Sequence, residues 1–242
     1  MRILLILFLF TACTKSNVQL TDEIDPDIVL INIGDGDRAF ISELLVKIDS
    51  CQPALIGIDA WFVQEKEARL DSALVAALMT VDNDILAYNL NPDFTLRKSH
   101  DKFREHVSAE GLAAVTLRRG ISSHFTPVTM IDKNECKHFA LEIVEWWKPD
   151  YGHSFEPNQV IPTNFTRTLA QYDHYSGSDI SSATHFSKLQ NKIVLLGYIG
   201  PSNEDKHFTP IRSKINFDKN EPDTYGVVVI ANQIRTILEY SD

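Results

Sequence analysis

Three short apolar runs, far apart in the chain, constrain the fold of this 242-residue sequence more than any other feature. They cover residues 27–33, 54–59 and 192–197, and Ile, Val and Leu dominate each of them. A strand with one face in water alternates apolar and polar side chains, so these runs predict strands buried on both faces. Such strands are typical of parallel sheets covered by helices.

Helical periodicity appears between and after these runs. Apolar residues recur at helical spacing in 38–49, 67–80, 137–147 and 225–239. Further strands are predicted at 84–88, 112–117 and 126–131, and a long irregular insertion at about 150–185. No linker rich in Pro or Ser divides the chain. We therefore predict an α/β fold in a single domain, with a mostly parallel central sheet and helices on both faces.

The first residues have the features of an export signal. A positive start precedes an apolar run at residues 3–10, which is too short for a bilayer-spanning helix of about 20 residues. The segment that ends at Cys13 resembles a bacterial lipobox, in which small residues precede a lipidated Cys. We predict a lipoprotein-type signal peptide at 1–12, lipidation of Cys13 and a polar tether at 13–26. The alternatives are a plain signal peptide or a buried Cys13.

Charge and cysteine content limit the possible partners. The net charge is -10 and is spread along the chain, whereas nucleic-acid binding needs a basic face, so we expect no nucleic-acid partner. A lipid anchor would hold the protein at a membrane of the cell envelope, on the periplasmic or extracellular side. Cys51 and Cys136 remain if Cys13 is lipidated, and they form either a disulfide or two free, buried thiols.

Polar residues follow the predicted strands at the points where the strands end. They are Asp35, Asp37 and Arg38 after the first strand, Asp59 after the second, and Asp205 beyond the strand that ends at Gly197. We expect the first two strands to be neighbours, which would place these residues at the ligand-binding edge of the sheet. The competing interpretation is structural. The aspartates then cap turns and helices, and Arg38 pairs with Asp59 or Asp205.

No complete catalytic motif accompanies these residues. The sequence lacks a zinc-protease His pair, a serine nucleophile elbow and a phosphate-binding loop, so we expect neither an enzyme nor a cofactor. The alternative is a metal-dependent hydrolase, because carboxylate oxygens suit Mg²⁺ or Ca²⁺. Its ligands would be Asp35, Asp37, Asp59 and Asp205.

One ordered series of segments resembles a known family. It comprises the strand at 28–33, the Arg38 turn, Ile56-Gly57-Ile58-Asp59, the strand at 192–197, Asp205 before Phe208-Thr209-Pro210, and the helix from Tyr225 to Asn232. This series is similar to the CHASE type two (CHASE-2) family of extracytoplasmic sensor domains, over residues 27–242. The resemblance implies a sensory module outside the cytoplasm, usually followed by membrane helices and a signalling domain. It supplies no set of binding residues.

These observations lead to one main hypothesis and two alternatives. The main hypothesis is an extracytoplasmic, lipid-anchored sensory or ligand-binding module, which binds a small molecule and lacks an output domain of its own. It would act through a separate signalling or envelope protein. The alternatives are the metal-dependent hydrolase and a structural envelope protein. If the protein is a structural envelope protein, we expect an exposed apolar patch over the last helix, residues 227–238, where a membrane partner docks.

Overall fold

A mostly parallel central sheet organises the computed structural model, which describes residues 19–183, 186–211 and 221–240. The strand order is β11-β1-β12-β2-β3, β5 continues the sheet beside β3, and β4 pairs antiparallel with the end of β3. The strands are β1 (Ile28–Asn32), β2 (Leu55–Ile58), β3 (Asp84–Leu90), β4 (Leu96–Arg97), β5 (Ala109–Leu112), β11 (Asp173–Ser176) and β12 (Ile193–Gly197). The predicted α/β class with a mostly parallel sheet is confirmed.

The three apolar runs form the centre of this sheet, but not in the order expected. β12 lies between β1 and β2, with Ile193 in register with Ile28 on one side and with Leu55 on the other. The prediction that the first two strands are neighbours is therefore wrong. A helix is about 10 Å wide and strands are about 4.8 Å apart, so one crossover helix spans two strand positions and leaves room for a later strand.

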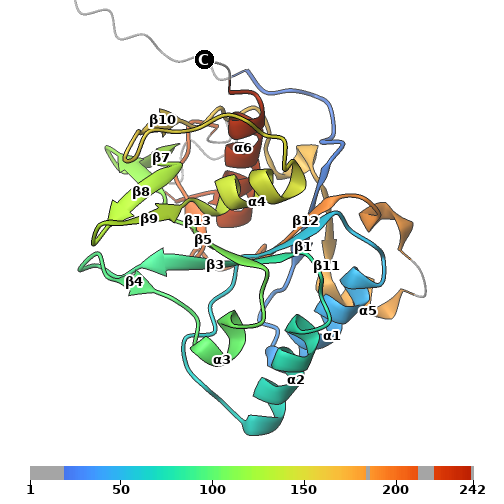
Figure 1. Cartoon of the computed structure of the whole chain (residues 1–242). Coiled ribbons are helices and arrows are strands. Elements are labelled where there is room, and N and C mark those ends of the chain that lie inside the picture. Colours follow the sequence, from blue (N-terminus) through green and yellow to red (C-terminus); the bar gives the residue numbers. More distant parts are fainter. Residues whose placement is uncertain (1–18, 184–185, 212–220, 241–242) are drawn as a thin grey trace, which may run out of the picture.

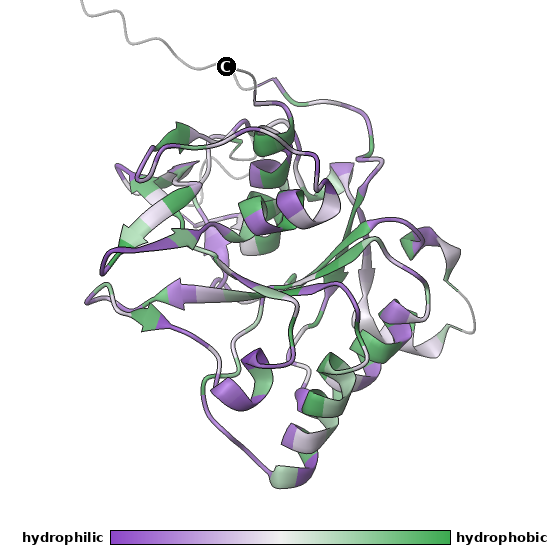
Figure 2. Cartoon of the chain, in the orientation of Figure 1, coloured by the Kyte–Doolittle hydropathy of each residue, from purple (hydrophilic) through white to green (hydrophobic). Residues whose placement is uncertain are grey.

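Helices cover both faces of the sheet (Figure 1). One face carries α1 (Arg38–Asp49), α2 (Ala68–Leu78), α3 (Asp101–Arg104) and α5 (Gly177–Ser182), and the other carries α4 (Phe139–Trp147) and α6 (Gly226–Leu238). Successive side chains of β1 pack on opposite faces of the sheet. Ile28 and Leu30 join the hydrophobic cluster under α4 and α6, whereas Val29 and Ile31 join the cluster under α1 and α2. The sheet is correspondingly apolar throughout its centre (Figure 2).

The last helix is a core element. Every residue of α6 from Gly226 to Ile234 is buried, as are Thr236 and Ile237. The apolar residues of this helix therefore face the interior and form no exposed patch. The observation that would have favoured a structural envelope protein is missing from the described part of the chain.

The middle of the chain adds small antiparallel sheets. β6 (Thr116–Arg118), β7 (Ile121–Phe125) and β10 (Ile161–Pro162) form one, and β8 (Val128–Ile131) and β9 (Asn134–Lys137) form a hairpin. The remaining elements are β13 (Lys206–His207), β14 (Thr224–Tyr225) and the short helices η1 (Leu169–Gln171) and η2 (Ser187–Leu189). The segment expected to be irregular contains β11, whose sequence Asp-His-Tyr-Ser is polar because an edge strand contacts one neighbour only.

Residues 19–27 lie along the domain and are called the strap below. The Thr21 N–H donates to the Thr166 carbonyl at 2.9 Å, and the Asp25 N–H donates to the Gln171 carbonyl at 2.8 Å. The strap begins at the end of the molecule where α6 finishes (Figure 1). The described part of the expected tether is therefore attached to the fold, whereas the signal peptide and Cys13 lie outside the described residues.

The two remaining cysteines are free and buried in different hydrophobic clusters. Cys51 packs under α1 and α2, and Cys136 packs with Tyr88 and Leu112. The alternative of two free thiols is therefore the one observed, because separate elements hold the two residues in separate parts of the core.

Candidate functional site

Three of the aspartates singled out by the sequence meet at the carboxyl end of the central strands. Asp35 follows β1, Asp59 follows β2, and Asp205 lies in the segment after β12. The cavity between them has a volume of about 310 Å³ and is also lined by Ile33, Ala60, Trp61, Tyr198 and Glu204. Ligands of open α/β sheets bind at this edge. We call this cavity the acidic cavity.

The parallel ladder places Asp59 in the cavity wall at the end of β2. Its N–H donates to the Leu196 carbonyl of the β12 strand at 2.8 Å, which continues the β2–β12 pairing by one residue. The side chain is partly buried, and no hydrogen bond from the described part of the chain reaches its carboxyl group. Asp59 is therefore available to a ligand.

Asn32 connects the end of β1 to the loop after β12. Its side-chain amide donates to the Ile199 carbonyl at 2.9 Å, and its side-chain oxygen accepts from the N–H groups of Ile199 at 2.8 Å and Gly34 at 2.9 Å. These bonds place the Asp35 turn beside the loop that leads to Asp205. Sequence reasoning missed Asn32, for which the only local signal is a polar residue at the end of an apolar strand.

Asp205 lies against the first residue of α6. The Gly226 N–H donates to the Asp205 carbonyl at 2.9 Å, and a Cβ atom at position 226 would be 2.6 Å from a carboxyl oxygen of Asp205. A larger residue at position 226 would therefore displace the Asp205 carboxyl group. The positive end of the helix dipole and its N–H groups favour a carboxylate at this point.

Two carboxyl groups of the acidic cavity have a raised pKa. Burial, and secondly the charge of Asp205, raise the pKa of Asp59 to about 7. Burial raises the pKa of Asp205 to about 6, although the hydrogen bond from Gly226 opposes this shift. Both groups therefore change charge near neutral pH, and a bound cation would favour their ionised forms.

Asp37 and Arg38 lie outside the acidic cavity. Asp37 caps α1, and its carboxylate accepts from the Phe40 N–H at 2.9 Å. Arg38 is buried and pairs with Asp71 of α2, and its guanidinium carbon lies 4.8 Å from the centre of the Phe103 ring. The expected pairing of Arg38 with Asp59 or Asp205 is therefore wrong. The first turn of α1 directs Arg38 toward α2, away from the sheet edge.

The donor set does not favour the hydrolase alternative. Within residues 19–183, 186–211 and 221–240, no three His, Cys, Asp or Glu side chains are grouped closely enough to hold a metal ion. One of the four carboxylates proposed for that role, Asp37, caps a helix. Asp35, Asp59 and Asp205, the other three, remain at the cavity together with Glu204.

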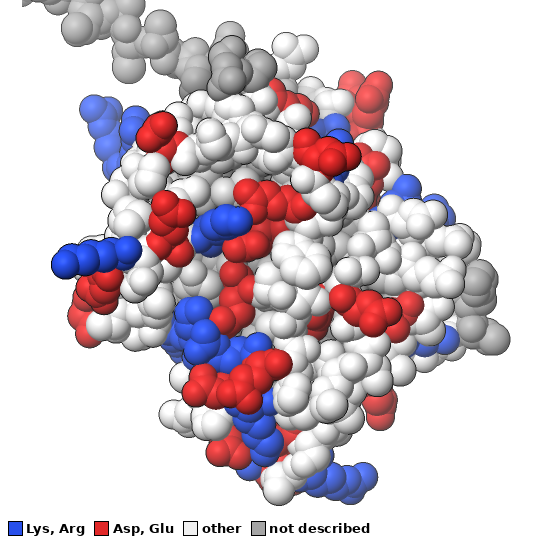
Figure 3. All heavy atoms as spheres, viewed as in Figure 1, with Lys and Arg blue, Asp and Glu red and all other residues white. Residues whose placement is uncertain are grey.

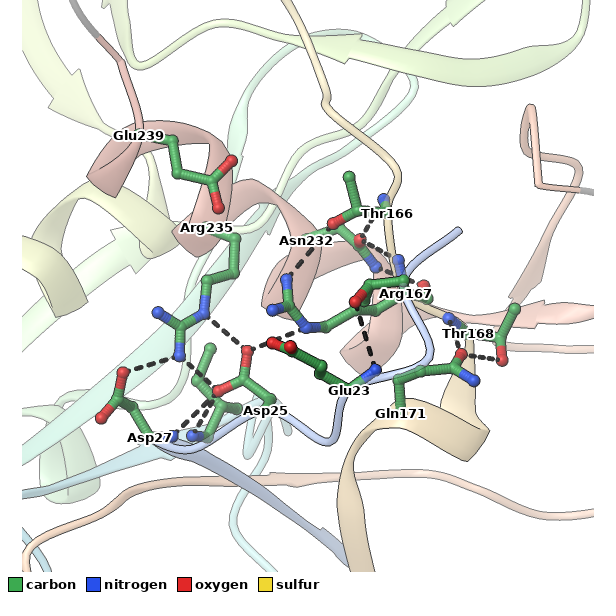
Figure 4. Close-up of polar contacts among 12 residues, drawn as sticks. Glu23, Asp25, Asp27, Thr166, Arg167, Thr168, Gln171, Asn232, Arg235 and Glu239 are labelled. Atoms are coloured by element: carbon green, nitrogen blue, oxygen red, sulfur yellow. Dashed lines mark hydrogen bonds and ion pairs between the residues drawn. The ribbon is translucent and has the colours of Figure 1, made fainter. Parts of the chain in front are cut away.

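A second polar cluster, unseen at the sequence level, joins the strap to α6 (Figure 4). The Arg235 Nε atom lies 2.6 Å from an Asp25 carboxylate oxygen, and Arg167 Nε lies 3.3 Å from the same carboxylate. Asp27 binds Arg235 at 2.8 Å. Burial alone would lower the pKa of Arg235, but the hydrogen bonds that Arg235 donates to Asp25 and Asp27 raise it. We call this cluster the strap clamp.

One face of the molecule carries mixed charge. On the face in Figure 3, Lys and Arg lie among Asp and Glu and form no continuous basic area. In the described residues, no helix has the length and apolar character to cross a bilayer.

The fold and the acidic cavity define a class of α/β domain with a cavity lined by carboxylates at the carboxyl edge of its sheet. The family model for the CHASE2 domain matches residues 21–242, a range that includes most of the strap. The chain therefore belongs to the CHASE2 family, a family of extracellular sensory domains. The comparisons found no match among curated proteins and none among solved structures.

Proposed function

We propose that this protein is an extracytoplasmic, lipid-anchored sensory module that binds a small ligand in the acidic cavity. It passes the signal to a separate signalling or envelope protein. The observation that carries this proposal is the meeting of Asp35, Asp59 and Asp205, from three distant segments, around one cavity. Membership of a sensory family supports the sensory role, and the lipobox-like segment that ends at Cys13 supports the anchor.

The lining of the acidic cavity favours a small organic cation. Four carboxylate residues line it, and no Lys or Arg is among its lining residues in the described chain. Trp61 and Tyr198 also line the cavity, and aromatic rings attract ammonium groups through their π faces. A ligand with an amine or quaternary ammonium group would meet both kinds of group.

Calorimetry of the full chain in detergent, with choline and spermidine as probes, tests this proposal. We expect at least one of them to bind, and we expect Asp59→Asn to weaken its binding by about tenfold, because a charged partner is lost. Affinity should increase as the pH rises from about 5 to about 8, since Asp205 and Asp59 ionise at about 6 and about 7.

Asp37→Asn is the matched control, because it changes the same charge outside the cavity and Asn also caps helices well. Dimethylbutanol, an uncharged analogue of choline with the same shape, should not bind. The proposal fails if neither cation binds, or if Asp59→Asn binds the cation as tightly as the native protein does.

A further inference from the structure

Two adjacent arginines lie at the tip of the β6–β7 hairpin. Arg118 ends β6, Arg119 and Gly120 form the turn, and Ile121 begins β7. All four residues are exposed. In the part of the chain that the structure describes, neither guanidinium forms an ion pair, and the hairpin at 116–125 contains no Asp or Glu. The tip therefore presents uncompensated positive charge.

The turn of this hairpin holds Arg119 in an unfavourable backbone conformation. Its φ angle is 54° and that of Gly120 is 79°, and a type I′ turn requires positive angles at both positions. Asn, Asp or Gly usually occupies the first position, because other side chains rarely adopt a positive φ. An arginine at such a position indicates a role for its side chain.

Apolar side chains flank the positive tip. Leu117 is 58% exposed and Ile121 is 41% exposed. The acidic cavity has a similar border, because Trp61 and Val63 are each 38% exposed. Arginine and tryptophan are the residues that contribute most to binding at protein interfaces. The hairpin tip and the acidic cavity are therefore complementary in charge, and both have apolar surface beside their charged groups.

The β8–β9 hairpin lacks this combination. Its two-residue turn also has positive φ angles, 50° at Asp132 and 66° at Lys133. Asp132 directly precedes the lysine, however, and Glu135 follows two residues later. The charge of Lys133 is therefore compensated locally, which leaves the β6–β7 tip as the better match for a cavity lined by carboxylates.

We propose that the β6–β7 hairpin of one copy of this chain inserts Arg119 into the acidic cavity of a second copy. The guanidinium would donate paired hydrogen bonds to the Asp59 carboxylate and stack on an aromatic ring of the cavity. A volume of about 310 Å³ is near the lower limit of about 300 Å³ for small-molecule sites, and it suits a single side chain. The hairpin of the same chain does not line the cavity, so a second copy supplies it.

The inference rests on the proposed function, since both treat the acidic cavity as a site for a cation. A small organic cation and the Arg119 side chain would then compete for the same carboxylates. Ligand binding would separate the two copies, and the change in assembly would be the signal that a separate protein detects.

Sedimentation equilibrium of the full chain, in a density-matched non-ionic detergent, tests this proposal. We expect self-association with a dissociation constant of about 100 µM or lower, as for a small interface. Arg119→Asp should raise this constant by about tenfold or more, because it places a negative charge against the cavity. The variant should fold, since Asp-Gly is a favoured type I′ sequence. Lys133→Asp is the matched control, because it makes the same change in the turn of the other hairpin, and it should leave self-association unchanged.

A mixture of two variants gives the sharpest result. Asp59→Asn alters the cavity but keeps the native hairpin, whereas Arg119→Asp keeps the native cavity. We expect each variant alone to associate weakly. Their mixture should associate more tightly than either, by about tenfold, because one native hairpin then meets one native cavity.

The proposal is overturned if the native chain is monomeric at about 500 µM, or if the mixture associates no more tightly than the separate variants. It is also overturned if Arg119→Asp weakens association and Asp59→Asn does not, since the hairpin then contacts a different surface. A cation that binds the cavity in calorimetry should dissociate the copies at saturation, and persistence of the assembly would contradict the proposal. If neither choline nor spermidine binds, the proposed ligand class fails, and the mixture still decides the self-association.

Discussion

At the scale of single residues, position in the fold decides what an aspartate does. Asp37 and Asp59 both follow an apolar strand in the sequence, yet Asp37 caps a helix and Asp59 lines a cavity. The difference arises because the N–H groups at the start of α1 satisfy Asp37. Asp59 instead continues a strand ladder with its backbone, which leaves its carboxyl group without a local donor.

Asp59 should make the protein less stable as the pH rises. Burial raises its pKa from an ordinary value of 3.8 to about 7 in the folded protein, so the folded state retains a proton that the unfolded state loses. Stability therefore falls between about pH 4 and about pH 7 and levels off above that range. We expect Asp59→Asn to raise the Tm by about 2–4 °C at about pH 8, with little effect at about pH 4.

Thermal unfolding followed by circular dichroism at both pH values measures this effect. The exposed helix cap Asp37→Asn serves as the control, because Asn also caps helices well and leaves the acidic cavity unchanged. A lower Tm for Asp59→Asn at both pH values would show that the carboxyl group stabilises the fold, contrary to this expectation.

At the scale of elements, the strap and α6 depend on each other. Asp25 and Arg235 are 210 residues apart, and the Asp25 carboxylate also accepts from the Ile28 N–H at 2.9 Å, at the first residue of β1. One buried carboxylate therefore holds the strap, the start of the central sheet and the last helix together. The polar composition of residues 13–26 predicts only a tether. The sequence gives no sign that Asp25 has a distant partner.

Asp25→Asn should destabilise the fold strongly. The substitution leaves Arg235 and Arg167, each with a 12% exposed side chain, without the carboxylate that both contact. Breaking a buried ion pair in this way costs about 3–5 kcal/mol. Urea unfolding measures the loss, and hydrogen exchange should increase first in residues 19–27.

Asp27→Asn provides the comparison for this element. Its side chain is 34% exposed and contacts Arg235 at 2.8 Å, so we expect a loss of about 1 kcal/mol or less. An equal loss of unfolding free energy in Asp25→Asn and Asp27→Asn would mean that burial of Asp25 does not increase its contribution to stability.

At the scale of the whole molecule, the acidic cavity and the strap belong to one domain. The acidic cavity occupies the carboxyl edge of the sheet, and the strap leads from the N-terminal region along the domain to β1. A lipid at Cys13 would place the strap nearest the membrane.

Cys13→Ala tests the anchor. Each buried acyl CH₂ group contributes about 0.8 kcal/mol to membrane binding, so loss of the lipid should move the full chain from the membrane fraction to the aqueous fraction. Cys51→Ala, in the buried core, should leave the protein in the membrane fraction. Mass spectrometry of the native protein should find Cys13 as the acylated first residue, and an intact Met1 would contradict the prediction.

Much of the local structure follows from side-chain periodicity. The predicted helix at 38–49 has the same bounds in α1, and the predicted helix at 225–239 differs from α6 by one residue at each end. The buried strands and the helices on both faces also follow, because they depend on neighbouring residues and their burial. The aspartates of the acidic cavity are predictable for the same reason. Each lies beyond a strand that the local sequence pattern predicts.

Tertiary structure alone decided the strand order, the partner of Arg38 and the strap clamp. β12 enters between β1 and β2 although more than a hundred residues separate it from either, and Arg38 finds Asp71 on α2. These outcomes depend on which pairs of distant segments bury the most apolar surface and leave the fewest charged groups unpaired. A pattern of neighbouring residues determines the elements of this protein, whereas competition among distant contacts determines how those elements meet.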